Sequence, residues 1–419
     1  MRKILLNKPD LLWGACLLGL ILLGQWQRLS FGEINFYLHD LVVVGWLVDL
    51  WRRQHRPLVI RAREQAGQLT RTAKLTLSLL VATVVMGWMI NLEWSAGLWA
   101  LTGLKWPLLY LGRIGAYLCL AWAIVIIKPF TANQLRAATS VTVLVTLLIG
   151  IGHFIISPDM RWLAIYGWDD HYFRLVGTQL DPGFAGLILV FGFWWALTNA
   201  RSNQRLFWLG AALATLLAIT LTWSRASYLS LVASITWAAI LSPSFIKRWG
   251  SEWGKGRLIL ALMAIIFISL IAFIPRPSGE GGKLARTSTV NARIEAGTTQ
   301  LSSFKGSDWI LGQGFLMINK AKISENYERP NHAKLPDNIL ITLGTGIGAI
   351  GLALLVTLVW QSRKIIQRLI SNYPLSATLM VAILVHSQFN NSLLQPFVGF
   401  FWLLILIAEK EMVSKRTQL

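Results

Sequence analysis

Charged residues are scarce in this sequence. Only 14% of its 419 residues are Asp, Glu, Lys or Arg, whereas a soluble domain carries about 25%. Hydrophobic residues make up 55% of the chain, and its mean hydropathy is +0.55. This composition excludes an ordinary soluble protein and places the chain among membrane proteins.

Acidic residues and cysteines are also few. The chain has 19 Asp and Glu but 39 Lys and Arg, which gives a net charge of +20. The basic residues lie in short clusters between apolar runs, the pattern of membrane topology, so no nucleic-acid partner is expected. The two cysteines, Cys16 and Cys119, lie inside apolar runs and can build neither a disulfide framework nor a metal site. No cofactor is expected.

Long apolar runs dominate the chain, and a spanning helix needs about 20 such residues. Twelve segments qualify as candidates, and the second has the shortest apolar core, between Asp40 and Asp49. The sequence therefore predicts one all-α polytopic membrane domain over residues 1–419, with about twelve spans. The candidates are Leu11–Gln27, Phe36–Leu50, Leu75–Asn91, Pro107–Ile127, Thr139–Ser157, Gly183–Leu197, Leu206–Thr222, Ala226–Leu241, Leu258–Pro275, Asn338–Trp360, Ser376–Phe389 and Leu393–Ala408.

The distribution of basic residues predicts the orientation of these spans. With the N-terminus in the cytoplasm, the cytoplasmic segments hold 24 Lys and Arg, and the short segments on the other side hold 5. Long loops cross the membrane largely regardless of charge, so the loop Arg276–Asp337 does not count against this orientation. Both termini are expected in the cytoplasm, and the long loop between spans nine and ten is expected outside.

Arg225 is the first residue that can carry chemistry. It is the only charged residue between Leu206 and Ile246, and it lies at the predicted outer turn of a helical hairpin. One interpretation is an arginine that extends its side chain to the membrane surface. The other is an anion site, because the planar guanidinium donates two hydrogen bonds to one phosphate.

Two further arginines lie in or beside predicted spans. Arg174 opens a turn-rich segment that leads through Asp181-Pro182-Gly183 into a span. Asp181 is expected to cap that helix, with Pro182 at the first helical position. Arg113 lies about two turns inside the fourth span, where it either pairs with an acidic residue or contacts a lipid phosphate.

The long loop contributes the remaining candidates. Arg286 and Arg293 lie on either side of the start of a short stretch near Val290–Leu301 that is compatible with a helix. The loop ends at Asp337, which can be a helix N-cap, a general base at the membrane surface, or both. His332 is a second candidate base, because its side chain titrates near neutral pH.

In this order, these segments resemble the O-antigen ligase and O-antigen polymerase family of bacterial envelope glycosyltransferases. The resemblance covers Arg174 to Gly351. Ligases of this family carry His-Asn at the loop exit, whereas this chain has Asp337-Asn338, which is more similar to the polymerases and other exopolysaccharide-assembling relatives. The motifs are Arg174…Gly177-Thr178…Asp181-Pro182, Ser224-Arg225, Arg293…Trp309…Leu311-Gly312-Gln313-Gly314, and Asp337-Asn338 followed by Gly348-Ala349-Ile350-Gly351.

The resemblance implies a metal-independent, inverting enzyme of the bacterial inner membrane, with a GT-C-like fold and a catalytic region over 174–351. Its donor would be an undecaprenyl-diphosphate-linked oligosaccharide. Its acceptor would be a glycan or lipid-linked glycan, and its partners would include the lipid bilayer and envelope polysaccharide assembly proteins. The residues assigned to the donor diphosphate are Arg174, Arg225, Arg293, Arg286 and Arg113, and those assigned to catalysis are Asp337 and His332.

Three other functions stay open at this point. A ligase would join finished polymer to lipid A–core instead of extending the glycan. A lipid-linked glycan flippase or a secondary transporter would place broken helices and ionisable residues near the membrane midplane. A scaffold for polysaccharide assembly would need neither Asp337 nor the outer arginines.

Overall fold

The computed structural model describes residues 8–31, 34–68, 70–92, 95, 104–166, 169, 171–200, 204–241, 253–276, 288–317 and 337–416. α-Helices dominate this part of the chain, with short 3-10 helices and one π-helix (η5) between them. In chain order the elements are α1 (Lys8–Leu23), η1 (Gly24–Gln27), β1 (Arg28–Phe31), β2 (Ile34–Tyr37), α2 (Leu38–Gln68), α3 (Arg71–Ile90), α4 (Lys105–Ile127), α5 (Ala132–Ile156), η3 (Arg161–Tyr166), η4 (Gly177–Gln179), α6 (Pro182–Asn199), α7 (Arg205–Leu221), α8 (Arg225–Thr236), η5 (Trp237–Leu241), α10 (Trp253–Phe273), α11 (Ser288–Ser302), α12 (Asp308–Leu311), α13 (Ile339–Gln361), α14 (Arg363–Asn372), α15 (Pro374–Asn390), η9 (Ser392–Leu394) and α16 (Pro396–Arg416).

Six helical segments in the described chain are long and apolar enough to cross a membrane. A seventh results if α14 and α15, which meet at a bend of 116°, count as one span. The protein is therefore an all-α polytopic membrane protein. The expected number of about twelve spans stays a prediction, because other apolar helices such as α7 are shorter. The six segments are Pro9–Gln27, Arg71–Ile90, Pro107–Ile127, Ala132–Ile156, Pro182–Asn199 and Ile339–Gln361.

One small β-hairpin interrupts the helical pattern. β1 and β2 pair antiparallel, with Arg28 opposite Tyr37 and Phe31 opposite Ile34. The hairpin follows η1 and leads directly into α2. The sequence predicts no hairpin here, because the stretch falls in the connection between the first two expected spans and at the start of the second.

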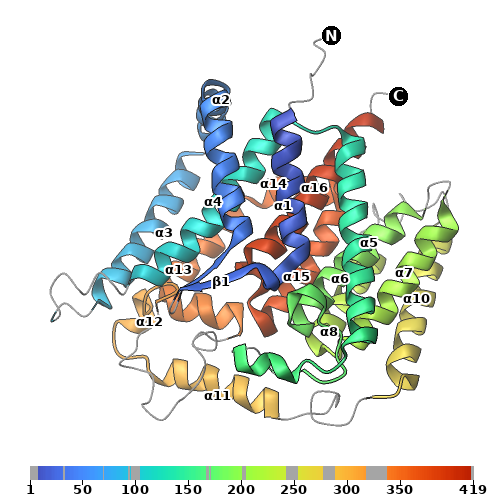
Figure 1. Ribbon diagram of the computed structural model, residues 1–419. Helices are drawn as coiled ribbons and strands as arrows, with labels where there is room; N and C mark the ends of the chain where they lie inside the picture. The colour runs from blue at the N-terminus through green and yellow to red at the C-terminus, as the bar shows by residue number, and fades with distance from the viewer. Residues whose placement is uncertain are drawn as a thin grey trace.

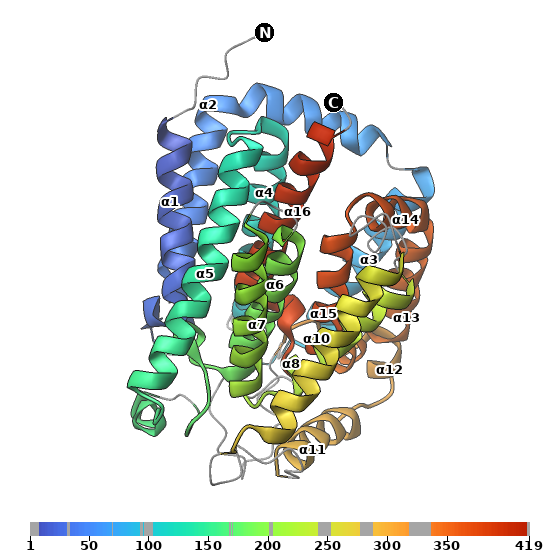
Figure 2. The ribbon, with the colours of Figure 1, turned by 90° about the vertical axis from the view of Figure 1, so that its right-hand side faces the viewer.

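The two ends of the helix bundle differ in what they carry. Figures 1 and 2 show the start of α1 and the end of α16 at one end of the bundle, and α11 lying across the opposite end, called the α11 end below. α11 corresponds to the helix expected near Val290–Leu301, so that local prediction is confirmed. α11 therefore crosses the bundle at the end opposite the start of α1 and the end of α16.

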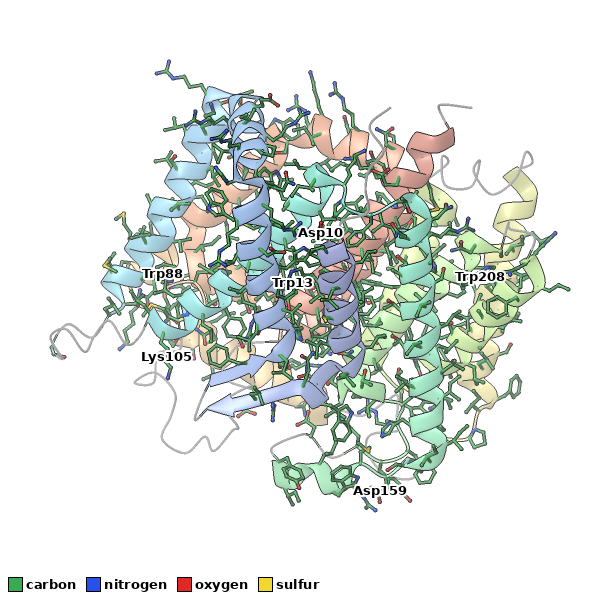
Figure 3. All side chains as sticks on the ribbon, turned by 45° about the horizontal axis from the view of Figure 1, so that its top comes forward. Asp10, Trp13, Trp88, Lys105, Asp159 and Trp208 are labelled. Atoms are coloured by element: carbon green, nitrogen blue, oxygen red, sulfur yellow. The ribbon has the colours of Figure 1, made fainter. Side chains whose placement is uncertain are left out.

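The α2 helix is held to α1 by Asp49, one of the two acidic residues that bound its apolar core, and by Arg53. Asp10 and Trp13 on α1, which Figure 3 labels, both form hydrogen bonds with side chains of α2. Arg53 donates hydrogen bonds of 2.7 Å to Asp10 and to Asp49, and the Trp13 indole donates to Asp49 at 2.9 Å. These ionised groups are mutually paired, as charges next to an apolar region require.

The α6 helix forms the centre of the bundle. It is apolar on all sides, and nearly all of its residues are buried, as expected of a helix surrounded by others. Its neighbours are α5, α7, α8 and α15. Because α6 is enclosed, its first turn has a fixed position at the α11 end.

Two of the sequence motifs pack directly against each other. The helix α13 is broken at Gly348, whose φ of +61° favours glycine. A Cβ on Gly348 would lie 2.5 Å from the backbone N of Gly312, just after α12, and 2.5 Å from the carbonyl O of Ile310. The Gln313 N–H donates to the Thr345 carbonyl at 2.7 Å, which satisfies one carbonyl next to the break. The segment around α12 is therefore docked on α13, backbone against backbone.

This contact predicts that Gly348→Ala destabilises the protein. The new methyl group would clash with Gly312 and Ile310 and would force an alanine into the left-handed region, at a cost of about 2–4 kcal/mol. Thermal unfolding of the detergent-solubilised protein measures the effect. Gly344→Ala on the same helix is the control, because the nearest atom to its Cβ would be Leu352 Cδ1 at 3.8 Å. Equal unfolding temperatures for the two variants would contradict the docking.

Candidate functional site

Arg293 on α11 contacts two segments that lie far from it in the sequence. Its Nη2 donates a hydrogen bond of 3.0 Å to Oδ1 of Asn390, at the end of α15. Its Nε lies 3.5 Å from Oδ2 of Asp337, just before α13. This Nε is buried and donates no hydrogen bond within the described part of the chain. The guanidinium therefore lies between an amide oxygen and a carboxylate.

The carboxylate of Asp337 is directed to Arg293 because the neighbouring residue caps the helix. Asn338 is the N-cap of α13, and its Oδ1 accepts from the amides of Leu340 and Ile341 at 2.9 and 3.1 Å. The proposed alternative that Asp337 is the N-cap is wrong. Both are good capping residues, but the helix begins one residue later than that alternative requires. The Asp337 side chain is 52% exposed and accessible to a substrate.

The start of α13 is tied to the end of α15 by two further hydrogen bonds. Nδ2 of Asn338 donates to the Gln388 carbonyl at 3.1 Å, and the Asn391 amide donates to the Asp337 carbonyl at 3.2 Å. These bonds hold the backbone of Asp337 from both sides. The position of its carboxylate is therefore set by α13 and α15 together, although both are far from α11 in sequence.

Arg225 is the first residue of α8, and its charge interacts with that of Arg293. Burial lowers the pKa of the Arg225 guanidinium, and the positive charge of Arg293 lowers it further. An arginine stays protonated despite such shifts. Two neighbouring positive charges repel each other in a region of low dielectric constant, and a bound anion would remove that repulsion.

Three helices begin around the last turn of α15. The N-caps are Asp181 for α6, Ser224 for α8 and Asn338 for α13. The expected cap at Asp181 is confirmed, since its Oδ1 accepts from the Phe184 amide at 2.7 Å. Burial raises the pKa of Asp181, while the Phe184 amide and the Arg174 charge act in the opposite direction. The positive ends of these helix dipoles add to the arginine charges.

Arg174 lies behind the turn that presents Arg225. Its Nε donates to the Thr222 carbonyl at 3.1 Å and its Nη2 to the Trp223 carbonyl at 3.4 Å, and the side chain is buried. These carbonyls belong to the last turn before Ser224, where Trp223 has a φ of +51°. Arg174 therefore supports the turn before α8, and its direct contact with a diphosphate stays a prediction.

Arg113 belongs to a different cluster. Its Nε lies 2.9 Å from Oδ2 of Asp40 on α2, and both side chains are largely buried. The hydroxyl of Tyr117, one turn along α4, donates to the other carboxylate oxygen at 3.2 Å. Of the two interpretations of Arg113, the structure shows the ion pair, and its assignment to a diphosphate stays a prediction. The remaining candidates, Arg286 and His332, lie outside the described residues.

Two residues at the site were not identified in the sequence. Asn390 at the end of α15 is not among the predicted site residues, yet it binds Arg293. His386 lies one turn earlier on α15 and is fully buried. A signal existed in both cases, because a polar or ionisable residue inside an otherwise uncharged span is costly unless it has partners or a function.

The described residues thus bring Arg225, Arg293, Asp337 and Asn390 together at the α11 end. No group of three or more His, Cys, Asp or Glu side chains suited to a metal occurs within the described ranges. Comparisons with protein-family models, curated proteins and solved structures find no match to this chain.

Proposed function

We propose that the protein is a membrane glycosyltransferase that moves a glycan from a polyprenyl-diphosphate donor to the hydroxyl group of an acceptor sugar. The main support is the contact between Arg293 and Asp337, a cationic donor beside an accessible carboxylate at one end of an apolar bundle. A diphosphate needs the first group and an attacking hydroxyl needs the second. In this proposal the chain has about twelve spans, with the site at the outer leaflet and both termini in the cytoplasm.

The donor diphosphate would lie between Arg225 and Arg293. Cleavage of the bond from the anomeric carbon to the phosphate oxygen leaves negative charge on the diphosphate, and cationic donors that are already in position stabilise that charge. Each charge-assisted hydrogen bond contributes about 1.5–3 kcal/mol. The guanidinium of Arg293 is one such donor.

The carboxylate of Asp337 would act as the general base. It takes the proton of the acceptor hydroxyl while the oxygen attacks the anomeric carbon and the diphosphate leaves from the opposite face. Attack from that face inverts the anomeric centre. Asp337 and Arg293 lie in the same site at the α11 end, so the base and the donor diphosphate would be held in one place, and reactions of this kind depend on such positioning.

Acceptor choice distinguishes a polymerase from a ligase, and we favour the polymerase because Asp337 occupies the place of the ligase histidine. The test is an assay of the purified protein with a polyprenyl-diphosphate oligosaccharide, with and without a lipid A–core acceptor. The expected result is a lengthened lipid-linked glycan in both reactions. Product only with lipid A–core would assign a ligase. A donor that stays chemically intact under both conditions would overturn the proposal and favour a flippase or a scaffold.

A further inference from the structure

His386 is a buried histidine that joins three helices beneath the candidate site. It is fully inaccessible to solvent. Its Nδ1 lies 2.6 Å from Oγ of Ser392 in η9, and its Nε2 lies 3.4 Å from Oγ of Ser227 on α8. Ser227 Oγ in turn lies 3.1 Å from the Gly183 carbonyl on α6. These partners suit a neutral ring that donates from Nε2 and accepts at Nδ1.

The network continues to the first turn of α8, which carries Arg225. Ser227 Oγ lies 2.9 Å from Oγ of Ser224, the N-cap of α8. Ser224 in turn accepts a hydrogen bond from the Ser227 amide at 3.3 Å. The histidine, the two serines and Arg225 therefore form one connected unit, and the position of the guanidinium depends on the hydroxyl groups below it.

The packing leaves little freedom for this unit to move. A Cβ on Gly186 would overlap the side chain of Ser227, so α6 and α8 touch at this level. A Cβ on Gly183 would overlap Nδ2 of Asn390, the residue that binds Arg293. Both arginines of the site are thus linked to the same junction of α6, α8 and α15.

We infer that His386 is a positioning residue that orients Arg225 for the donor diphosphate through Ser227 and Ser224. This inference rests on the proposed function. Because His386 is fully buried, it does not touch the substrate, and its effect passes through α8. Loss of its Nε2–H leaves the Ser227 hydroxyl without its partner on α15. The first turn of α8, which carries Arg225, is then less ordered.

Two substitutions distinguish the contributions of the hydrogen bonds made by the two ring nitrogen atoms. His386→Asn keeps an acceptor near the position of Nδ1 and the contact with Ser392, but it loses the contact with Ser227. His386→Gln extends a donor to the position of Nε2 and keeps the contact with Ser227. Ser234→Ala is the matched control, because Ser234 is fully buried on α8 and binds the Trp194 indole at 2.9 Å, remote from the first turn.

The probe is farnesyl diphosphate, a short prenyl diphosphate, titrated onto the full-length protein in detergent. His386→Asn and Ser227→Ala are expected to weaken binding about fivefold to tenfold, the loss that corresponds to one hydrogen bond. Their double variant is expected to be no weaker than either single variant, because the two residues form one unit. His386→Gln and Ser234→Ala are expected to bind as the wild type does. Hydrogen exchange of residues 225–228 should accelerate only in the two weakened variants.

The outcomes separate this inference from the proposed function. If the wild type binds farnesyl diphosphate and Arg225→Ala does not, the diphosphate site is supported. If His386→Asn then binds as tightly as the wild type, with unchanged exchange at residues 225–228, the positioning role is overturned alone. If the wild type fails to bind the probe, the proposed diphosphate site is overturned, and the role of His386 falls with it. An equal loss of farnesyl diphosphate affinity in the Asn and Gln variants would show that His386 contributes only to packing, which would contradict the inference.

Discussion

Replacing Asp337 by Asn is expected to lower the rate of glycosyl transfer by about 10²–10⁴-fold, the usual contribution of a general base. The amide has nearly the same shape as the carboxylate but does not accept the proton of the acceptor hydroxyl. Donor binding should change little, because the arginines that hold the diphosphate are still present. The measurement is the turnover of a polyprenyl-diphosphate oligosaccharide by purified protein at saturating donor, together with the dissociation constant for farnesyl diphosphate.

The neighbouring residue provides the control for this prediction. Asn338 caps α13 with two hydrogen bonds, so Asn338→Ala should lower the free energy of unfolding by about 1 kcal/mol. Asp337→Asn should leave that stability nearly unchanged, because a half-exposed ion pair contributes little. Unchanged turnover in Asp337→Asn would rule out the base. Lost turnover accompanied by a loss of stability like that of Asn338→Ala would point to a structural role instead.

Local features of the structure could be predicted from the sequence because they depend on neighbouring residues. The apolar runs predicted helices that are present in the structure, and the stretch near Val290–Leu301 is α11. The combination Asp181-Pro182 predicted an N-cap and a first helical residue, and both are found. A cap needs only its own helix, and an apolar run needs only its own length, so no distant contact had to be known.

The features that could not be predicted all depend on contacts between distant segments. Asp337 and Asn338 are adjacent and equally suited to cap α13; the residue that does so, Asn338, also donates to the Gln388 carbonyl on α15. Arg113 is the only charged residue within its predicted span, and its partner Asp40 lies on α2, far away in the sequence. Arg174 binds carbonyl groups, which every residue carries, so no sequence pattern marks its partners.

The glycine contact shows how such distant contacts build the site. Gly312 and Gly348 belong to two motifs separated by a stretch of chain that the structure does not describe, yet each occupies the space that a side chain on the other would need. This contact anchors the segment after α11 against α13. Because α11 carries Arg293 and α13 begins after Asp337, the anchor helps to fix the distance between the cation and the carboxylate.

Replacing Arg225 or Arg293 by Ala is expected to lower kcat/KM for the donor by about 10²–10³-fold each, the usual effect of removing one donor to a developing charge. The two residues would bind the same diphosphate, so the double variant should lose less than the product of the two single losses. Lysine should restore only part of the activity at either position, because it keeps the charge but not the planar pair of donors.

Arg161→Ala is the matched control for these arginine variants. Arg161 is more exposed, and its side chain is paired with Asp159, two residues away, at 2.6 Å. Its loss should leave donor binding and turnover unchanged, whereas Arg225→Ala and Arg293→Ala should also weaken farnesyl diphosphate binding. Raising the salt concentration should weaken wild-type binding more than that of either variant, since each variant has one charge fewer to be screened. Full activity in Arg225→Ala at normal protein levels would show that the diphosphate does not bind at this site. The proposal requires two cations, and Arg293 would be the only one left.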